Sequence, residues 1–422
     1  MDASANHFDL IVVGAGAAGL FAAANAAEAG VRTLLIEKMR KPGIKILASG
    51  GTKCNVTSTL PIKELGLWFG QRAERFLRHG LHTLSPKDLR ELLSAEGVGT
   101  EESAFEKVFP QSGRASDVLR AFLQRLERSG ADLRLGLACQ NLTRGEDDGS
   151  SGYGWRLATP DGELCARRVI VTSGGLSFPK TGCTGDGYGW LQKLGHTVAR
   201  PRPALVPLRA AEPWVKALTG ISVPEAEVFV RDQKGKVIFR RRRPLLFTHR
   251  GLSGPGPMDA SGYLNVEVGP HRPLYVDFLP EHRREDLEQM IKSDHGGGLL
   301  AQCLADIFPR RLARGIIQGA RIPNDRRAAE LRKDERLRLL DFLKGGAIQI
   351  SGDEGFDKAE VTAGGVKLDE VNPKTMESRI VPGLYIAGEI LDLVGPIGGF
   401  NFQAAFSTGT LAGRAAATQV QL

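Results

Sequence analysis

Apolar runs and glycines near the N-terminus follow each other in the order of a strand–turn–helix–strand unit. The run Asp9–Val13 is short, mostly apolar and β-branched, which is typical of a buried strand in a parallel sheet. The glycine-rich segment Gly14–Gly19 follows it directly, and Leu20–Ala29 is rich in strong helix formers. A second apolar run, Thr33–Ile36, leads into Glu37. This order predicts the first crossover of a Rossmann-like α/β sheet.

The glycine segment has the residue types that a dinucleotide pyrophosphate requires. Gly14 permits a tight turn, Gly16 lets the backbone approach the phosphates, and Gly19 lets the helix pack closely on the strand. The N–H groups at the start of the helix attract the phosphate charge. Glu37 can accept hydrogen bonds from a ribose hydroxyl and would repel a 2′-phosphate. FAD or NAD is therefore expected rather than NADP.

Further glycine-rich segments favour a flavin dinucleotide. Lys41–Asn55 continues from the second strand with three glycines, which a nicotinamide dehydrogenase does not need and a wide flavin ring does. Val169–Gly175 and Gly383–Glu389 each read as a buried strand followed by glycine. Gly398–Asn401 opens an Ala-rich helix, whose N–H dipoles would face the flavin edge that becomes negative on reduction. An ordinary loop-to-helix entry is the alternative interpretation of this last segment.

Composition describes a soluble globular chain. It has 422 residues with 42% hydrophobic and 25% charged side chains, enough for two or three domains. No apolar run is long enough to span a membrane, and the N-terminus lacks the regions of a secretion signal. The five cysteines lack CxxC spacing, which argues against a disulfide framework or a metal site: Cys54, Cys139, Cys165, Cys183 and Cys303. We expect a cytoplasmic protein.

The net charge of +8 raises the question of nucleic acid. The densest basic run is Arg240–Arg243, and elsewhere Lys and Arg are interleaved with acidic residues. Because no recognised binding motif accompanies the charge, the pattern argues against a nucleic-acid partner.

The sequence resembles the two-dinucleotide-fold flavoproteins of the glutathione-reductase superfamily. Within them it is similar to a bacterial family of NAD(P)/FAD-dependent oxidoreductases that includes aminoacetone-oxidase-like proteins and a bile-acid dehydro-steroid reductase branch. Besides the N-terminal fingerprint, three blocks carry the resemblance: Ser49–Asn55, Thr172–Gly189 and Glu360–Gly409. These blocks extend over nearly the whole chain.

The resemblance implies a set of FAD contacts along the chain. Those at the pyrophosphate and adenosine are Gly14, Ala15, Gly16, Ala17, Gly19, Glu37, Lys38 and Ala138. Those beside the flavin and ribityl chain are Lys45, Ser49, Gly50, Gly51, Asn55, Gly174, Gly175, Gly388, Glu389, Gly398, Gly399, Phe400 and Asn401.

The sequence lacks the residues that dithiol–disulfide exchange and a dedicated NAD(P)H-binding domain would require. Cys54 has no second cysteine five positions along, so dithiol–disulfide exchange is not expected there. No second strand–GxGxxG–helix unit is present, so NAD(P)H would visit the flavin transiently, or electrons would come from a substrate or another protein. His249, in a stretch that matches the family, is a candidate proton donor, although a structural histidine in a turn fits equally well.

The leading hypothesis is an FAD-dependent oxidoreductase that transfers a hydride between flavin and a small-molecule substrate. The alternatives are a flavin-dependent nucleic-acid-modifying enzyme and an FAD-binding redox partner without its own substrate. We expect a discontinuous FAD-binding domain (1–200 and 346–422), a β-rich subdomain (201–280) and a helical subdomain (281–345). The substrate, the direction of electron flow and the oligomeric state stay open.

The ribose interpretation predicts that Glu37→Arg impairs FAD retention, because a cation replaces the hydrogen-bond acceptor at the ribose. The flavin absorbance of the purified variant, relative to protein, measures the effect. Full flavin occupancy would contradict the interpretation.

Overall fold

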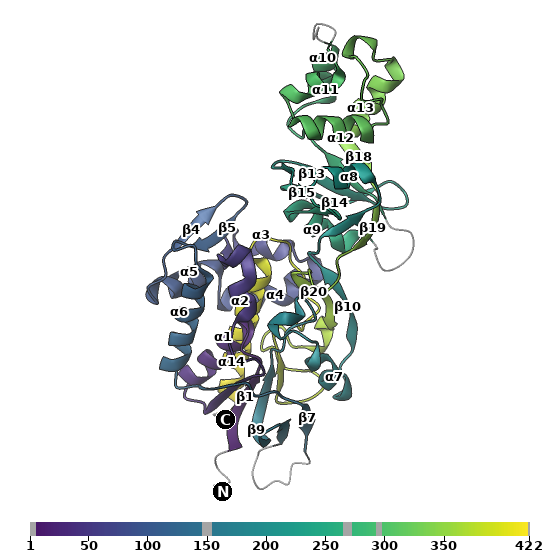
Figure 1. Cartoon of the computed structure of the whole chain (residues 1–422). Helices are drawn as coiled ribbons and strands as arrows, with labels where there is room; N and C mark the ends of the chain where they lie inside the picture. Colours follow the sequence, from purple (N-terminus) through teal and green to yellow (C-terminus); the bar gives the residue numbers. More distant parts are fainter. Residues whose placement is uncertain (1–5, 146–153, 265–271, 293–297, 421–422) are drawn as a thin grey trace. The chain divides into compact units, whose positions relative to one another are not determined.

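The computed structural model describes residues 6–145, 154–264, 272–292 and 298–420 (Figure 1). The chain divides into two compact units. The first unit combines Met1–Pro203 with Val361–Leu422, and the second is Ala204–Glu360. The first unit is thus built from both ends of the chain, and the second is an insertion between them. Among the described helices, none has both the length and the apolar character needed to cross a membrane.

A seven-stranded sheet forms the centre of the first unit, with the path β6–β2–β1–β9–β8–β7 and β21 paired to β9. Its strands are β1 (His7–Val13), β2 (Thr33–Glu37), β6 (Asp132–Leu135), β7 (Asn141–Arg144), β8 (Trp155–Thr159), β9 (Gly162–Val171) and β21 (Leu384–Ile386). All pairs among β6, β2, β1, β9 and β21 are parallel, whereas β8 runs antiparallel to both β9 and β7. The apolar runs predicted as buried strands therefore form the parallel part of the sheet.

The register of the parallel strands aligns their carboxyl ends. Val13 pairs with Ile36 on one side and with Val171 on the other, and Val171 also pairs with Ile386. Because parallel strands end at the same edge, the segments that follow them converge there.

Two helices of the first unit are packed backbone against backbone. They are α1 (Ala17–Glu28) and α14 (Phe400–Val420). A Cβ atom added at Gly409 of α14 would lie 2.2 Å from the carbonyl oxygen of Ala18, and one at Gly413 would lie 2.3 Å from that of Ala22. The two glycines of α14 are thus explained by close contact with the α1 backbone, since helix propensity alone disfavours glycine.

An aromatic cluster joins these two helices to α6 (Ala115–Arg128). The ring centroids of Phe21 and Phe406 are 4.6 Å apart, and Phe122 lies 4.9 Å from Phe21 and 5.2 Å from Phe406. The other elements of this part of the chain are α2 (Ile44–Ala48), β3 (Thr57–Ser58), α3 (Ile62–Leu67), α4 (Gln71–Thr83), α5 (Pro86–Ala95), β4 (Thr100–Ser103), β5 (Lys107–Pro110), α7 (Asp186–Lys193), β10 (Val198–Ala204) and β20 (Val361–Val366).

The second unit contains two antiparallel sheets, ordered β12–β15–β16–β11–β19 and β14–β13–β17–β18. Its strands are β11 (Leu208–Ala210), β12 (Ser222–Val223), β13 (Glu227–Arg231), β14 (Val237–Arg242), β15 (Leu245–Phe247), β16 (Gly251–Ser253), β17 (Leu274–Asp277), β18 (Gly346–Ile348) and β19 (Ile350–Asp353). Its helices are α8 (Pro213–Ala217), α9 (Pro255–Ala260), α10 (Arg284–Lys292), α11 (Leu300–Cys303), α12 (Arg310–Gly319) and α13 (Lys333–Gly345).

The organisation of this unit differs from the domain boundaries expected from sequence. Strand and helix residues share one hydrophobic core, which includes Val228, Phe247 and Ile316. The segment 346–360, expected in the FAD-binding domain, clusters with the insertion instead. The reason is strand pairing, since β18 is hydrogen-bonded to β17 and β19 to β11. A composition shift along the chain does not reveal such pairing.

We predict that Gly409→Ala destabilises the first unit, because the added methyl would overlap the α1 backbone. Overpacking of this kind costs about 1–3 kcal/mol. Urea unfolding followed by circular dichroism measures the change. Gly189→Ala is the matched control, because Gly189 is an exposed helical glycine with no atom within 4 Å of an added Cβ. Equal unfolding midpoints for the two variants would contradict the packing argument.

Candidate dinucleotide-binding site

The segments predicted to bind the cofactor follow the aligned ends of the parallel strands. The turn at Gly14–Gly19 follows β1, Lys38 follows β2, Gly174 and Gly175 follow β9, and Gly388 and Glu389 follow β21. Residues far apart in sequence are therefore brought to one edge of the sheet, which is where α/β folds bind ligands.

The three fingerprint glycines have the geometry that the sequence predicts. Gly14 has a φ of +105°, and a Cβ there would lie 2.8 Å from the Thr172 carbonyl oxygen. At Gly19 a Cβ would lie 1.8 Å from the carbonyl oxygen of Gly14, so only glycine allows this contact between helix and turn. Gly16, by contrast, has no atom within 4 Å of that position. Gly14 and Gly19 are thus in close contact with the protein's own backbone, whereas the space beside Gly16 is open to a ligand.

The first turn of α1 has no acidic side chain of its own and no side-chain cap. Gly16 is the N-cap of this helix. Gly16 and Ala17 are both partly exposed. These amide groups can therefore receive a phosphate.

Glu37 is fixed at the end of β2. Its carboxylate accepts hydrogen bonds from the backbone N–H of Ala15, at 2.8 Å, and of Met39, at 2.9 Å. The carbonyl of Glu37 accepts a hydrogen bond from the N–H of Leu137, which places Ala138 beside this strand end. The predicted adenosine residues thus lie together, and Glu37 also holds the glycine turn in place.

Lys38 turns toward the segment after β9. Its ammonium group forms an ion pair with Asp186, at 2.5 Å, and a hydrogen bond with the hydroxyl of Thr184. Both partners belong to the sequence block that carried the family resemblance. Lys38 is therefore held by this loop.

A polar network connects four segments of the first unit: α2, the loop after β9, β20 and the loop after β21. The Lys45 ammonium lies 2.6 Å from the Glu389 carboxylate and donates to the Ser177 hydroxyl at 2.8 Å. The Ser177 hydroxyl in turn donates to Glu389 at 2.5 Å, and the Thr362 N–H donates to Glu389 at 3.0 Å. The hydroxyl oxygen of Thr362 accepts from the N–H of Ser177.

The network keeps Lys45 charged. Burial lowers the pKa of Lys45, but the charge of Glu389 and the hydrogen bond to it outweigh burial and raise that pKa above its ordinary value. Burial raises the pKa of the Cys183 thiol, so it stays neutral. The sequence predicted Lys45 and Glu389 but missed Ser177 and Thr362. Both lie within the resembling blocks, but no spacing rule singles out a lone hydroxyl.

Two glycines, Gly398 and Gly399, precede α14 and have backbone angles that favour glycine. Gly399 has a φ of +86°, and a Cβ there would lie 2.2 Å from the Thr57 carbonyl oxygen. The Asn401 side chain both accepts from and donates to the backbone of Gly395, at 2.8 Å in each case. Phe400 is buried. The Asn401 amide therefore fixes the loop, which leaves the backbone of this turn to meet a ligand.

The segment Ser49–Asn55 is a glycine-containing turn. Gly50 and Gly51 both have left-handed backbone angles and are exposed. The Asn55 side chain accepts a hydrogen bond from the N–H of Val108 at 3.1 Å, and Ser49 donates to the Ile46 carbonyl. These two polar side chains are thus used within the fold.

His249 belongs to the other unit of the chain. It is exposed, between β15 and β16 of the second unit. The other predicted site residues all belong to the first unit.

The fold and this strand edge define a Rossmann-type dinucleotide-binding protein. A model of the HI0933-like protein Rossmann domain matches residues 8–415, so the chain belongs to the HI0933-like family.

Relatives cover almost the whole chain. The ribosomal RNA dihydrouridine synthase of Escherichia coli is 33% identical over 95% of this chain and 96% of its own length. The 3-dehydro-bile acid delta(4,6)-reductase of Clostridium scindens is 30% identical over 96% and 98%.

Among solved structures, the 3-ketosteroid delta1-dehydrogenase of Sterolibacterium denitrificans has a TM-score of 0.52. It is 13% identical over 98% of this chain and 100% of its own, and this likeness concerns the fold. The predicted family, fold class and assignment as a flavin-dependent oxidoreductase are confirmed.

We predict that Cys54 and Cys139 resist alkylation in the folded protein. Burial raises the pKa of both thiols to about 12, so the reactive thiolate is scarce until the pH approaches that value. Labelling with iodoacetamide at neutral pH, followed by mass spectrometry, measures the rates. Cys165 is the internal control, because its side chain is only partly buried. Labelling of Cys54 as fast as Cys165 would contradict the interpretation of Cys54 as an inert buried side chain.

Proposed function

We propose that this protein is an FAD-dependent reductase that saturates a carbon–carbon double bond conjugated to a carbonyl, with a uridine in RNA as its substrate. The observation that supports the reaction is chemical. Two classes of relative, each similar over nearly the whole chain, are named for substrates that share this bond. In uridine the C5=C6 bond is conjugated to the C4 carbonyl, and in a 3-dehydro bile acid the ring double bonds are conjugated to the C3 carbonyl.

The residues at the strand edge fit FAD. The open space at Gly16 and the uncapped start of α1 suit a pyrophosphate, and Glu37 suits the ribose. When bound and reduced by an electron donor, the flavin would supply the hydride that such a reduction needs.

On the flavin side, we assign three roles to this chain's residues. The network of Lys45, Ser177 and Glu389 would orient the ribityl hydroxyls, because it presents both donors and acceptors in fixed positions. The amides at Gly398–Asn401 would stabilise negative charge on the flavin edge. Ser49, Gly50, Gly51 and Gly174 would let backbone pass close to the ring.

The proton and the electrons need separate sources. We assign the proton to His249, because an exposed imidazole can act as a general acid. NAD(P)H as a transient electron donor fits the single GxGxxG unit of the chain.

RNA is preferred as the substrate over a small molecule. The charge pattern argued against a nucleic-acid partner, but two relatives, at 33% and 32% identity, are named for ribosomal RNA. A net charge of +8 suits a polyanion. A small-molecule enone is the second candidate, and the 30% identical bile-acid reductase favours it.

The test uses the purified yellow protein without oxygen. We expect NADH or NADPH to bleach the flavin, and unmodified ribosomal RNA to restore its absorbance while gaining dihydrouridine, detected by nucleoside mass spectrometry. Glu37→Arg, deficient in FAD, should give no product. Restored absorbance with an enone steroid but not with RNA would reject the RNA assignment in favour of the small molecule.

A further inference from the structure

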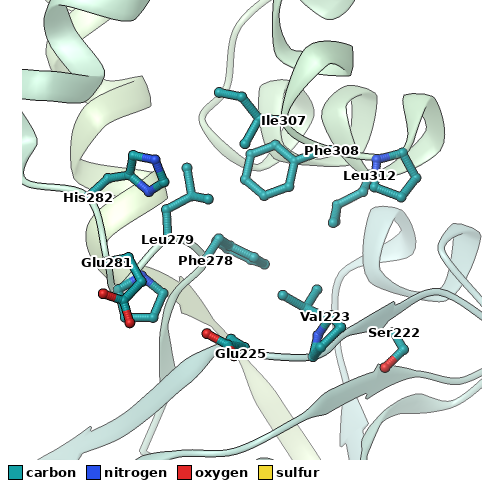
Figure 2. Close-up of a pocket in the computed structure, with 13 residues that line it drawn as sticks. Ser222, Val223, Glu225, Phe278, Leu279, Glu281, His282, Ile307, Phe308 and Leu312 are labelled. Carbon is teal, nitrogen blue, oxygen red and sulfur yellow. The ribbon is translucent and has the colours of Figure 1, made fainter.

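A cavity of about 310 Å³ lies within the second unit, lined by none of the residues assigned above (Figure 2). It is bounded by β12, by the segment 278–282 and by the segment 307–312 at the start of α12. The Phe278 and Phe308 rings and the side chains of Val223 and Leu312 form its apolar part. This volume is at the lower end of the range for small-ligand pockets, about 300–1,000 Å³.

The wall at 278–282 is held in place by Lys344. Its ammonium donates to the carbonyl oxygens of Leu279 and His282, at 2.8 Å each, and pairs with Asp277 at 2.6 Å. The Phe278 ring stacks on Phe342, with centroids 6.0 Å apart. The aromatic surface of the cavity is therefore preformed.

Polar side chains also line the cavity. Glu225 and Glu281 both line it, and both form ion pairs with the single Arg242, so one of their two negative charges is balanced and the other can accept a hydrogen bond from a ligand. His282 lies beside them in Figure 2, and its buried Nδ1 has no hydrogen-bond partner among the described residues. A ligand with a flat apolar face and a hydrogen-bonding edge would satisfy both the apolar and the polar side chains.

Next to this cavity, α12 carries two exposed arginines. Arg310 follows the cavity residue Pro309 directly, and Arg314 lies one turn further along the same face. No ion pair involves either of them among the described residues. Like charges four residues apart destabilise a helix, so these two arginines do not stabilise α12. A bound anion that contacts both of them would explain their placement.

We infer that this region binds single-stranded RNA, with one unstacked base between Phe278 and Phe308 and its flanking phosphates on Arg310 and Arg314. A nucleobase has the required flat face and hydrogen-bonding edge, and proteins recognise single-stranded RNA by stacking such bases on aromatic rings. The inference rests on the proposed RNA substrate and adds a second binding region, which is distinct from the site of reduction.

The electrostatic part is tested by the salt dependence of binding. A short single-stranded RNA labelled with a fluorophore is titrated with the whole FAD-loaded protein at several salt concentrations. Removing one cation that neutralises a phosphate reduces the slope of log affinity against log salt by about 0.7. The double variant Arg310→Ala/Arg314→Ala should therefore reduce the slope by about 1.4, twice that amount. The control Lys234→Ala/Lys236→Ala removes the same charge from an exposed hairpin outside the cavity and should leave the slope near that of the wild type.

The cavity is tested by filling it. An RNA containing 2-aminopurine should become less fluorescent on binding the wild type, because the base stacks on phenylalanine. Ser222→Trp, at an exposed position of the cavity, should abolish the quenching and leave the salt slope unchanged. Ser351→Trp is the control, because Ser351 is an exposed serine on another strand of the same sheet, outside the cavity. Circular dichroism and flavin content verify that each variant is folded.

The outcomes separate this inference from the proposed function. Abolished quenching in Ser222→Trp together with the reduced slope of the arginine variant supports the inference. Equal quenching in Ser222→Trp and wild type, or an unchanged slope in the arginine variant, overturns it even if uridine is still reduced. A wild-type protein that does not bind RNA but reduces an enone overturns both proposals.

Discussion

The contact between Gly19 and the carbonyl of Gly14 is the constraint on which the cofactor edge depends. It allows α1 to begin directly above the end of β1, and any side chain at Gly19 would overlap the turn. The same helix is contacted at Ala18 and Ala22 by the glycines of α14. The N-terminal fingerprint and the last helix of the chain are therefore coupled through backbone contact, and the strand ends between them stay aligned.

Ion pairs and hydrogen bonds also hold the strand edge of the first unit in place. Glu37 and Glu389 both accept backbone N–H groups, and Glu389 also forms the ion pair with Lys45 across a sequence separation of 344 residues. A carboxylate buried without partners would be costly, so each is placed where donors already converge. The residues that would bind the cofactor are for this reason also residues that hold the fold together. A substitution at Glu37 acts through both roles.

The second unit carries surface features that are separate from the strand edge of the first unit. Relatives named for ribosomal RNA and for a bile acid are similar to this chain over nearly its whole length, so a change of substrate does not require a change of fold. In this chain the second unit has its own hydrophobic core, a preformed aromatic cavity and two exposed arginines beside it. Such a unit can evolve a new surface while the strand edge of the first unit stays constrained by glycine packing.

The sequence by itself determined the cofactor unit, because its determinants are local. Alternation of apolar runs and glycines locates β1, α1 and β2, and backbone geometry at Gly14 and Gly19 admits few other residues. It could not locate Ser177 or Thr362, whose roles come from partners far away in the chain. Nor could it place 346–360, because strand pairing and a shared core are decided by contacts between distant segments. The cavity beside α12 is likewise a property of tertiary structure alone, since three separate segments must meet to form it.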